Sequence, residues 1–99
     1  MENNYKGKYY IVRGDKSGVF AGEIESRNGQ EIKMKKVRRI WYWDGACSIS
    51  ELAVNGTAEP NNCKFTVEVD NLEILDAIEV IECTKKAEKS IKGVKVWKY

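Results

Sequence analysis

One dipeptide, Asn28-Gly29, constrains the fold of this chain more than any other feature of the sequence. Asn-Gly is the strongest short-range signal for a β-hairpin, because both central residues of a type I′ turn have positive φ. The segments on either side, 19–26 and 31–43, are rich in β-branched and aromatic residues, which favour strands. The sequence therefore predicts a long hairpin at the centre of the molecule.

The apolar alternation in the second hairpin strand changes phase near Lys36. Ile32 and Met34 share one face, but the next apolar residue, Val37, has the opposite parity. A one-residue slip would move every later side chain to the other face of the sheet. We therefore expect a β-bulge or a short break near Lys36, which would bend the strand strongly. Gly22 on the first hairpin strand predicts a second bulge or a close backbone approach.

The remaining segments read as short strands and two short helices. Ser48 to Glu51 forms a capping box and Gly56 is a stop signal, which predicts a helix of about two turns. Thr84 predicts the cap of a lysine-rich helix that Gly93 ends. Further strands are expected at 8–13, 63–69, 78–82 and 94–98.

These elements predict a single domain over residues 1–99 that is mainly β, in the α+β class. The expected architecture is a small, partly open barrel of the SH3-like or Sm-like kind. It has one short helix between strands and a short C-terminal helix. A half-barrel with the C-terminal helix packed across its mouth is the alternative.

Composition argues against catalysis. The chain has no histidine, which removes His-based acid/base chemistry and Ser-His or Cys-His nucleophiles. Its three cysteines have irregular spacing with no CxxC pair, so we expect small core residues rather than a metal site or disulfides. We therefore predict a protein that is not an enzyme and that uses no metal and no cofactor.

Charge is arranged in three blocks along the chain. Residues 1–43 carry ten basic and five acidic side chains, 44–83 one and nine, and 84–99 six and one, giving +5, −8 and +5. The blocks would either form a basic face and an acidic face or pair with each other across the sheet. The first arrangement suits self-association, so we expect a homo-oligomer.

The chain also shows no signal for a membrane. No apolar run approaches the roughly 18 residues of a spanning helix. The first residues, Met1-Glu2-Asn3-Asn4, are polar and are not followed by the apolar segment of a signal peptide. With its odd cysteine count, the chain is predicted to be cytoplasmic.

The segment from Arg38 to Ser48 is the candidate binding site. Indole and phenol rings offer flat faces for stacking a base, and guanidinium groups hold phosphate. The start of the helix at Ser48 offers free amides to an anion. The candidate ligand-binding residues are Arg38, Arg39, Trp41, Tyr42, Trp43, Gly45, Ala46, Ser48, Lys16 and Ser17.

Their proposed roles differ, and a structural reading stands beside the functional one. Beyond the bulge, Trp41 and Trp43 are expected to face one way, and Ile40 and Tyr42 the other. Small residues at Gly45-Ala46 would let a ligand approach the backbone. The Lys16-Ser17 turn would add phosphate contacts, or would be a plain hairpin turn. The two tryptophans could equally form the core of a small barrel.

This pattern resembles a family of small, largely uncharacterised proteins of tailed bacteriophages and prophages. The resemblance covers roughly residues 8–98 and rests on Gly18-Val19-Phe20-Ala21-Gly22, Arg38-Arg39-Ile40-Trp41-Tyr42-Trp43-x-Gly45-Ala46-x-Ser48-x-x-x-Leu52-Ala53, Asn62-Cys63-Lys64-Phe65 and Val96-Trp97. It implies a phage origin and the cytoplasm of an infected bacterium. It implies no activity and no site residues.

Three functions follow as hypotheses. The first, by analogy of size and setting, is an anti-defence "sponge" for immune evasion, which binds and sequesters a nucleotide-type signal without catalysis. The second is a single-stranded nucleic-acid-binding module, against which the acidic middle block and a pI near 8.4 argue. The third is a protein–protein adaptor that inhibits a host defence enzyme through Trp41 and Trp43.

Overall fold

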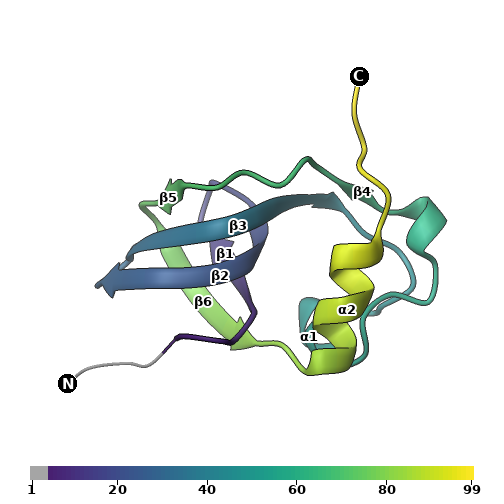
Figure 1. Ribbon diagram of the computed structural model, residues 1–99, viewed down its shortest axis with the longest axis horizontal. Helices are drawn as coiled ribbons and strands as arrows, with labels where there is room; N and C mark the ends of the chain where they lie inside the picture. The colour runs from purple at the N-terminus through teal and green to yellow at the C-terminus, as the bar shows by residue number, and fades with distance from the viewer. Residues whose placement is uncertain (1–4) are drawn as a thin grey trace.

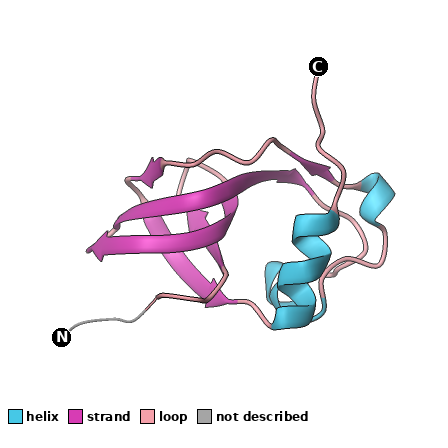
Figure 2. Ribbon diagram, in the orientation of Figure 1, coloured by secondary structure: helices cyan, strands magenta, loops and turns pink. Residues whose placement is uncertain are grey.

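A computed structural model describes residues 5–99 of the chain. In chain order the elements are β1 (Tyr10–Gly14), β2 (Val19–Asn28), β3 (Glu31–Tyr42), α1 (Ile49–Asn55), a 3-10 turn η1 (Pro60–Asn62), β4 (Lys64–Phe65), β5 (Leu72–Ile74), β6 (Ala77–Glu82) and α2 (Lys85–Gly93). Strands dominate, and both helices gather at one end of the molecule (Figures 1 and 2). The predicted mainly β class with two short helices is confirmed.

The six strands form one antiparallel sheet that does not close. Its strand order is β4-β3-β2-β1-β6, and β5 also pairs with β3. The chain from β4 to β5 follows β3 along its free side, with a bridge between Val37 and Val69 midway (Figure 1). The sheet therefore curls around a core and remains open between β5 and β6.

The central hairpin is present, but its turn differs from the prediction. Asn28 still pairs with Glu31, so the two loop residues are Gly29 and Gln30. Gly29 has φ of 64°, whereas Gln30 is not among the residues with positive φ. One positive φ at the first loop position is the pattern of a type II′ turn, and the type I′ prediction is wrong. Gly29 is the first loop residue rather than the second, because Asn28 remains in the strand.

The predicted bulge in β3 is confirmed at Lys36. Gly22 on β2 lies opposite the two residues Lys36 and Val37, and the pairing register shifts there. Lys36 has φ of 49°, in the left-handed region. A Cβ at Gly22 would lie only 2.7 Å from the Cα of Val37, so the two backbones meet where a side chain has no room. The bulge returns Val37 to the same face as Met34.

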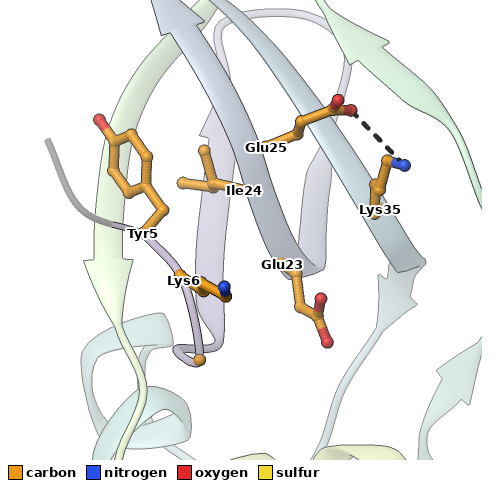
Figure 3. A pocket seen from close by; sticks show the side chains of 7 residues that line it. Tyr5, Lys6, Glu23, Ile24, Glu25 and Lys35 are labelled. Carbon is orange, nitrogen blue, oxygen red and sulfur yellow. Dashed lines mark ion pairs between the residues drawn. The ribbon is translucent and has the colours of Figure 1, made fainter. Parts of the chain in front are cut away.

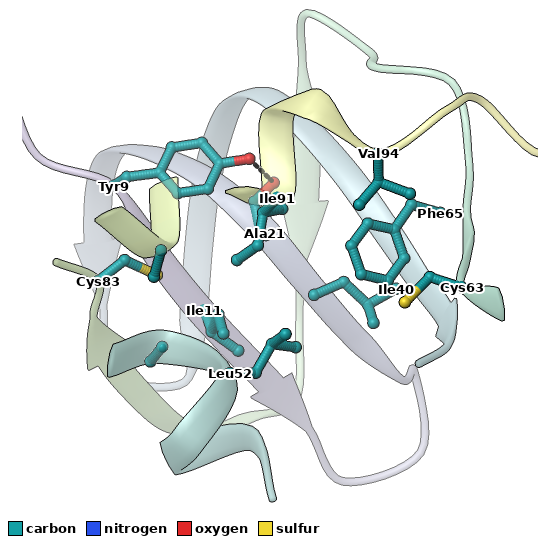
Figure 4. Close-up of a cluster of buried hydrophobic side chains, with 12 residues drawn as sticks. Tyr9, Ile11, Ala21, Ile40, Leu52, Cys63, Phe65, Cys83, Ile91 and Val94 are labelled. Carbon is teal, nitrogen blue, oxygen red and sulfur yellow. Dashed lines mark hydrogen bonds between the residues drawn. The ribbon is translucent and has the colours of Figure 1, made fainter. Parts of the chain in front are cut away.

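Both faces of the sheet are buried, which explains why the strands carry apolar residues at both parities. On the concave face the strands alone form a core of Tyr10, Val12, Phe20, Ile24, Ile32, Met34, Val37, Ile74 and Ala77. On the other face α1 and α2 cover a second cluster (Figure 4), whose largest members are Tyr9, Ile11, Leu52, Phe65 and Ile91. The Tyr9 hydroxyl donates to the carbonyl of Ala21 at 3.4 Å in this cluster.

The two helices begin and end at the predicted signals. Ser48 Oγ accepts from the Glu51 amide at 3.1 Å, and Gly56 ends α1 with φ of 76°. Thr84 Oγ1 accepts from the Ala87 amide at 3.0 Å at the start of α2. Neither helix is long and apolar enough to cross a membrane.

Two predicted strands are shorter in the structure or missing. The segment 63–69 contains only β4 and the isolated bridge of Val69, because the residues between them do not pair continuously with β3. The segment 94–98 is not a strand, since Val96 makes a single bridge with Phe65. A two-residue strand such as β4 offers too short an edge for a neighbour to pair along.

Candidate functional site

A stacked pair of indoles lies exposed on the surface of the described chain. Trp41 lies at the end of β3 and is 63% exposed, and Trp97 lies beyond α2 and is 44% exposed. Their ring centroids are 6.1 Å apart and their planes differ by 11°. The Trp97 amide donates to the Phe65 carbonyl at 2.8 Å, which holds its segment beside β4. Two indoles that far apart in sequence thus present one apolar platform to solvent.

Lysines surround the platform. Lys64 Nζ lies 5.5 Å from the centre of the Trp97 ring, in a cation–π contact. Lys95 and Lys98 flank Trp97 in sequence and are exposed. Proteins that bind single-stranded nucleic acids combine aromatic side chains, on which bases stack, with positively charged groups that contact the backbone.

Arg38 lies apart from this surface and is 4% exposed. Its guanidinium donates to three carbonyls, those of Thr66 at 2.8 Å, Ile91 at 2.8 Å and Phe65 at 3.1 Å. Burial lowers the pKa of Arg38. The arginine predicted to hold phosphate instead joins β3 to β4 and α2.

Arg39 and the Lys16-Ser17 turn are joined to each other. Arg39 Nη1 donates to the Ser17 carbonyl at 2.6 Å, and its guanidinium lies 4.5 Å from the centre of the Phe20 ring. The Asp76 carboxylate accepts from the Lys16 amide, the Ser17 amide and the Ser17 hydroxyl, at 2.8, 3.1 and 2.6 Å. These bonds, that of Ser17 Oγ foremost, lower the pKa of Asp76. The carboxylate of Asp76 thus occupies the position at which a phosphate was expected.

The start of α1 is also served by a carboxylate of the chain. Glu51 Oε1 accepts from the Cys47 amide at 2.7 Å while the Ser48 hydroxyl accepts from the Glu51 amide. The bond from Cys47 lowers the pKa of Glu51. Ser48 is therefore a helix cap, and the amide before it, that of Cys47, already has an anionic partner.

The Trp43-to-Ala46 turn packs against the chain itself. Strand β3 ends at Tyr42, so Trp43 leaves the pleat and packs on the core beneath the helices, on the side opposite to that predicted. Its Nε1 donates to the Ala46 carbonyl at 3.2 Å. A Cβ at Gly45 would lie 2.4 Å from the Glu59 amide nitrogen. Residues 57–59 therefore fill the space beside Gly45. Tyr42 remains at the surface and is 51% exposed.

A separate pocket lies between the N-terminal segment and the hairpin (Figure 3). Tyr5, Lys6, Glu23, Ile24, Glu25 and Lys35 line it, together with Gly7. Lys35 and Glu25 form an ion pair across its rim at 3.9 Å. Its mixed charges and open shape indicate no particular ligand.

The cysteines form no disulfide among the residues that the structure describes. Cys63 and Cys83 are buried as expected, whereas Cys47 is exposed, contrary to the prediction of a core position. Burial raises the pKa of Cys83 to about 12, so its thiol stays protonated. No group of acidic, cysteine or histidine side chains suited to a metal ion occurs among residues 5–99.

Fold and surface together define a small, open antiparallel sheet domain that carries an aromatic platform rimmed by lysines. The chain belongs to the family DUF6948, a domain of unknown function whose model matches residues 7–91. No curated protein and no solved structure matches it. The matched segment includes Trp41 and Lys64 and ends before Trp97.

Sequence reasoning found Trp41 and Tyr42 but missed the other half of the platform. Trp97 and Lys64 were seen only as part of a motif, because nothing in the local pattern links residue 97 to the end of β3. The one available signal was an indole in a segment with lysines on both sides, which is unusual for a core strand.

Proposed function

We propose that this protein is a binding module for single-stranded nucleic acid, with Trp41 as the stacking surface. The observation that supports this proposal is that Trp41 is 63% exposed while its ring stacks on that of Trp97. A fixed ring loses little freedom on binding, and every base has a face that can stack on it. Lys64 beside Trp97 supplies positive charge for the backbone.

The charge pattern is compatible with this proposal. Strand β6 pairs with β1, and its Glu79 and Glu82 form ion pairs with Arg13 on β1 and with Lys8 just before it, at 2.9 and 3.7 Å. The middle acidic block is therefore partly neutralised within the sheet. The carboxylates of Glu79 and Glu82 therefore have basic partners within the sheet, and the net charge of +2 does not repel a polyanion.

Replacing Trp41 by alanine should weaken binding of a labelled oligothymidylate about 5- to 150-fold, since stacking contributes about 1–3 kcal/mol per base. Fluorescence anisotropy at a fixed, low salt concentration measures this change. Trp43→Phe is the matched control, because Trp43 packs against the core, and it should retain binding. Absence of binding by the unaltered protein would contradict the proposal.

Sequestration of a nucleotide signal by a phage protein, the hypothesis that the sequence favoured, stays a prediction. It relied on Arg38, Arg39 and the start of α1 meeting in one pocket, but both guanidinium groups and the Cys47 amide hydrogen-bond within the chain. The geometry favours an open platform over an enclosing site. A thermal-shift screen with cyclic nucleotides and ADP-ribose derivatives tests it, because a ligand at a hundred times its Kd stabilises by about 2.7 kcal/mol.

A further inference from the structure

A hollow of about 390 Å³ lies beside Trp97, between the η1 turn and the chain that follows α2. Lys95, Trp97 and Lys98 line one side, and Pro60, Asn61 and Cys63 line the other. Its volume falls within the range of small-ligand pockets. None of these residues is acidic, so both ammonium groups border a space without a carboxylate.

The two lysines are available to a ligand. Neither forms an ion pair or a hydrogen bond with another residue in the range 5–99, in contrast to Lys85 and Lys92, which both contact Glu88. Two ammonium groups that line one hollow give it a positive potential. The local chemistry therefore favours an anion there.

Trp97 connects this hollow to the platform. Its ring stacks on Trp41 at a centroid distance of 6.1 Å, and the same residue lines the hollow. Lys64 lies over the Trp97 ring as well. A nucleotide whose base stacks on Trp41 thus has its backbone within reach of the hollow.

We infer that the hollow between residues 60–63 and 95–98 is a phosphate subsite, in which Lys95 and Lys98 hold a backbone phosphate of the strand stacked on Trp41. The inference rests on the proposed nucleic-acid binding. It assigns a role to the segment after α2, which lies outside the part of the chain that matches the family model.

The test is the salt dependence of oligothymidylate binding by Lys95→Gln/Lys98→Gln and by a control of equal charge, Lys86→Gln/Lys89→Gln. The control lysines are exposed on α2 and do not line the hollow. Each phosphate contact on a single strand contributes about 0.7 to the slope of log K against log salt. The first double variant should lose about 0.7 from the slope, since one phosphate contact is removed, and the control should keep it.

The outcomes separate the two proposals. Equal losses in both double variants would show a general charge effect and would overturn the subsite. An unchanged slope in Lys95→Gln/Lys98→Gln, with binding still dependent on Trp41, would overturn the subsite alone. No binding by the unaltered protein would remove both proposals. Circular dichroism of each variant checks that the fold is intact.

Discussion

At the scale of single residues, Arg38 shows how a side chain that looks functional can be structural. Arginine next to tryptophan is typical of phosphate or base recognition. Here the guanidinium is buried and donates to three backbone carbonyls. Their partial negative charges, with the Phe65 ring 5.5 Å away, replace the water that the cation loses.

Arg38→Met should lower the free energy of unfolding by about 2–4 kcal/mol, because it removes three buried charge-assisted hydrogen bonds and leaves the Thr66 carbonyl without a donor. The Phe65 and Ile91 carbonyls still accept from the Trp97 and Val94 amides. Urea denaturation monitored by circular dichroism measures the loss. Arg27→Met is the control, since its exposed side chain bonds only to Gly29, and it should change stability by less than about 0.5 kcal/mol. Similar effects for both variants would contradict the structural role of Arg38.

At the scale of elements, the bulge at Lys36 determines which face each later residue of β3 occupies. It places Val37 with the concave core and directs Arg38 towards α2. Lys36 adopts a backbone conformation that costs a non-glycine residue about 1–2 kcal/mol. The strand accepts this strain because the alternative register would expose the core residues.

Lys36→Gly should therefore raise the free energy of unfolding by about 0.5–1 kcal/mol, since glycine adopts positive φ without a steric penalty. Gly22→Ala, on the facing strand, should lower it, because the new Cβ would overlap the Val37 backbone. Thermal unfolding of both variants tests the pair of expectations. A stable Gly22→Ala variant would show that the two strands are less closely packed than the structure indicates.

At the scale of the whole molecule, Asp76 ties together two loops on the open side of the sheet. It lies between β5 and β6, and its carboxylate holds the turn between β1 and β2. A carboxyl whose folded pKa is lowered stabilises the fold fully above its unfolded pKa of about 3.9. That contribution decreases as the pH falls through the lower folded value.

Asp76→Asn should consequently destabilise the protein at pH 7, and the difference should shrink as the pH falls below the unfolded pKa of about 3.9. The Asp76 carboxylate accepts hydrogen bonds from two backbone amides. Asparagine would instead place its own N–H donors against one of them. Urea midpoints of both proteins across this pH range give the comparison. Ser17→Ala removes only the hydroxyl bond and should show the same trend with a smaller amplitude. A difference that grows towards acid pH would contradict this account.

The same scale shows why part of the molecule could be predicted and part could not. The hairpin, the bulge at Lys36 and both helix caps depend on residues within a few positions of each other, and all were found. The burial of Arg38 depends on carbonyls 27 to 53 positions away, and the partner of Trp41 is residue 97. Such contacts follow from how the sheet curls, which periodicity does not describe. The direction of Trp43 was wrong for a related reason, because the strand ends one residue before it.

The three hydrogen bonds of Arg38 influence which residues of this domain can be substituted. Its three acceptors are main-chain oxygens, which residues 65, 66 and 91 provide whatever side chain they carry. Substitution at Thr66 or Ile91 therefore leaves the acceptor in place, provided that the backbone keeps its path. A single guanidinium can thus hold a strand, a loop and a helix together while the sequences of its partners drift.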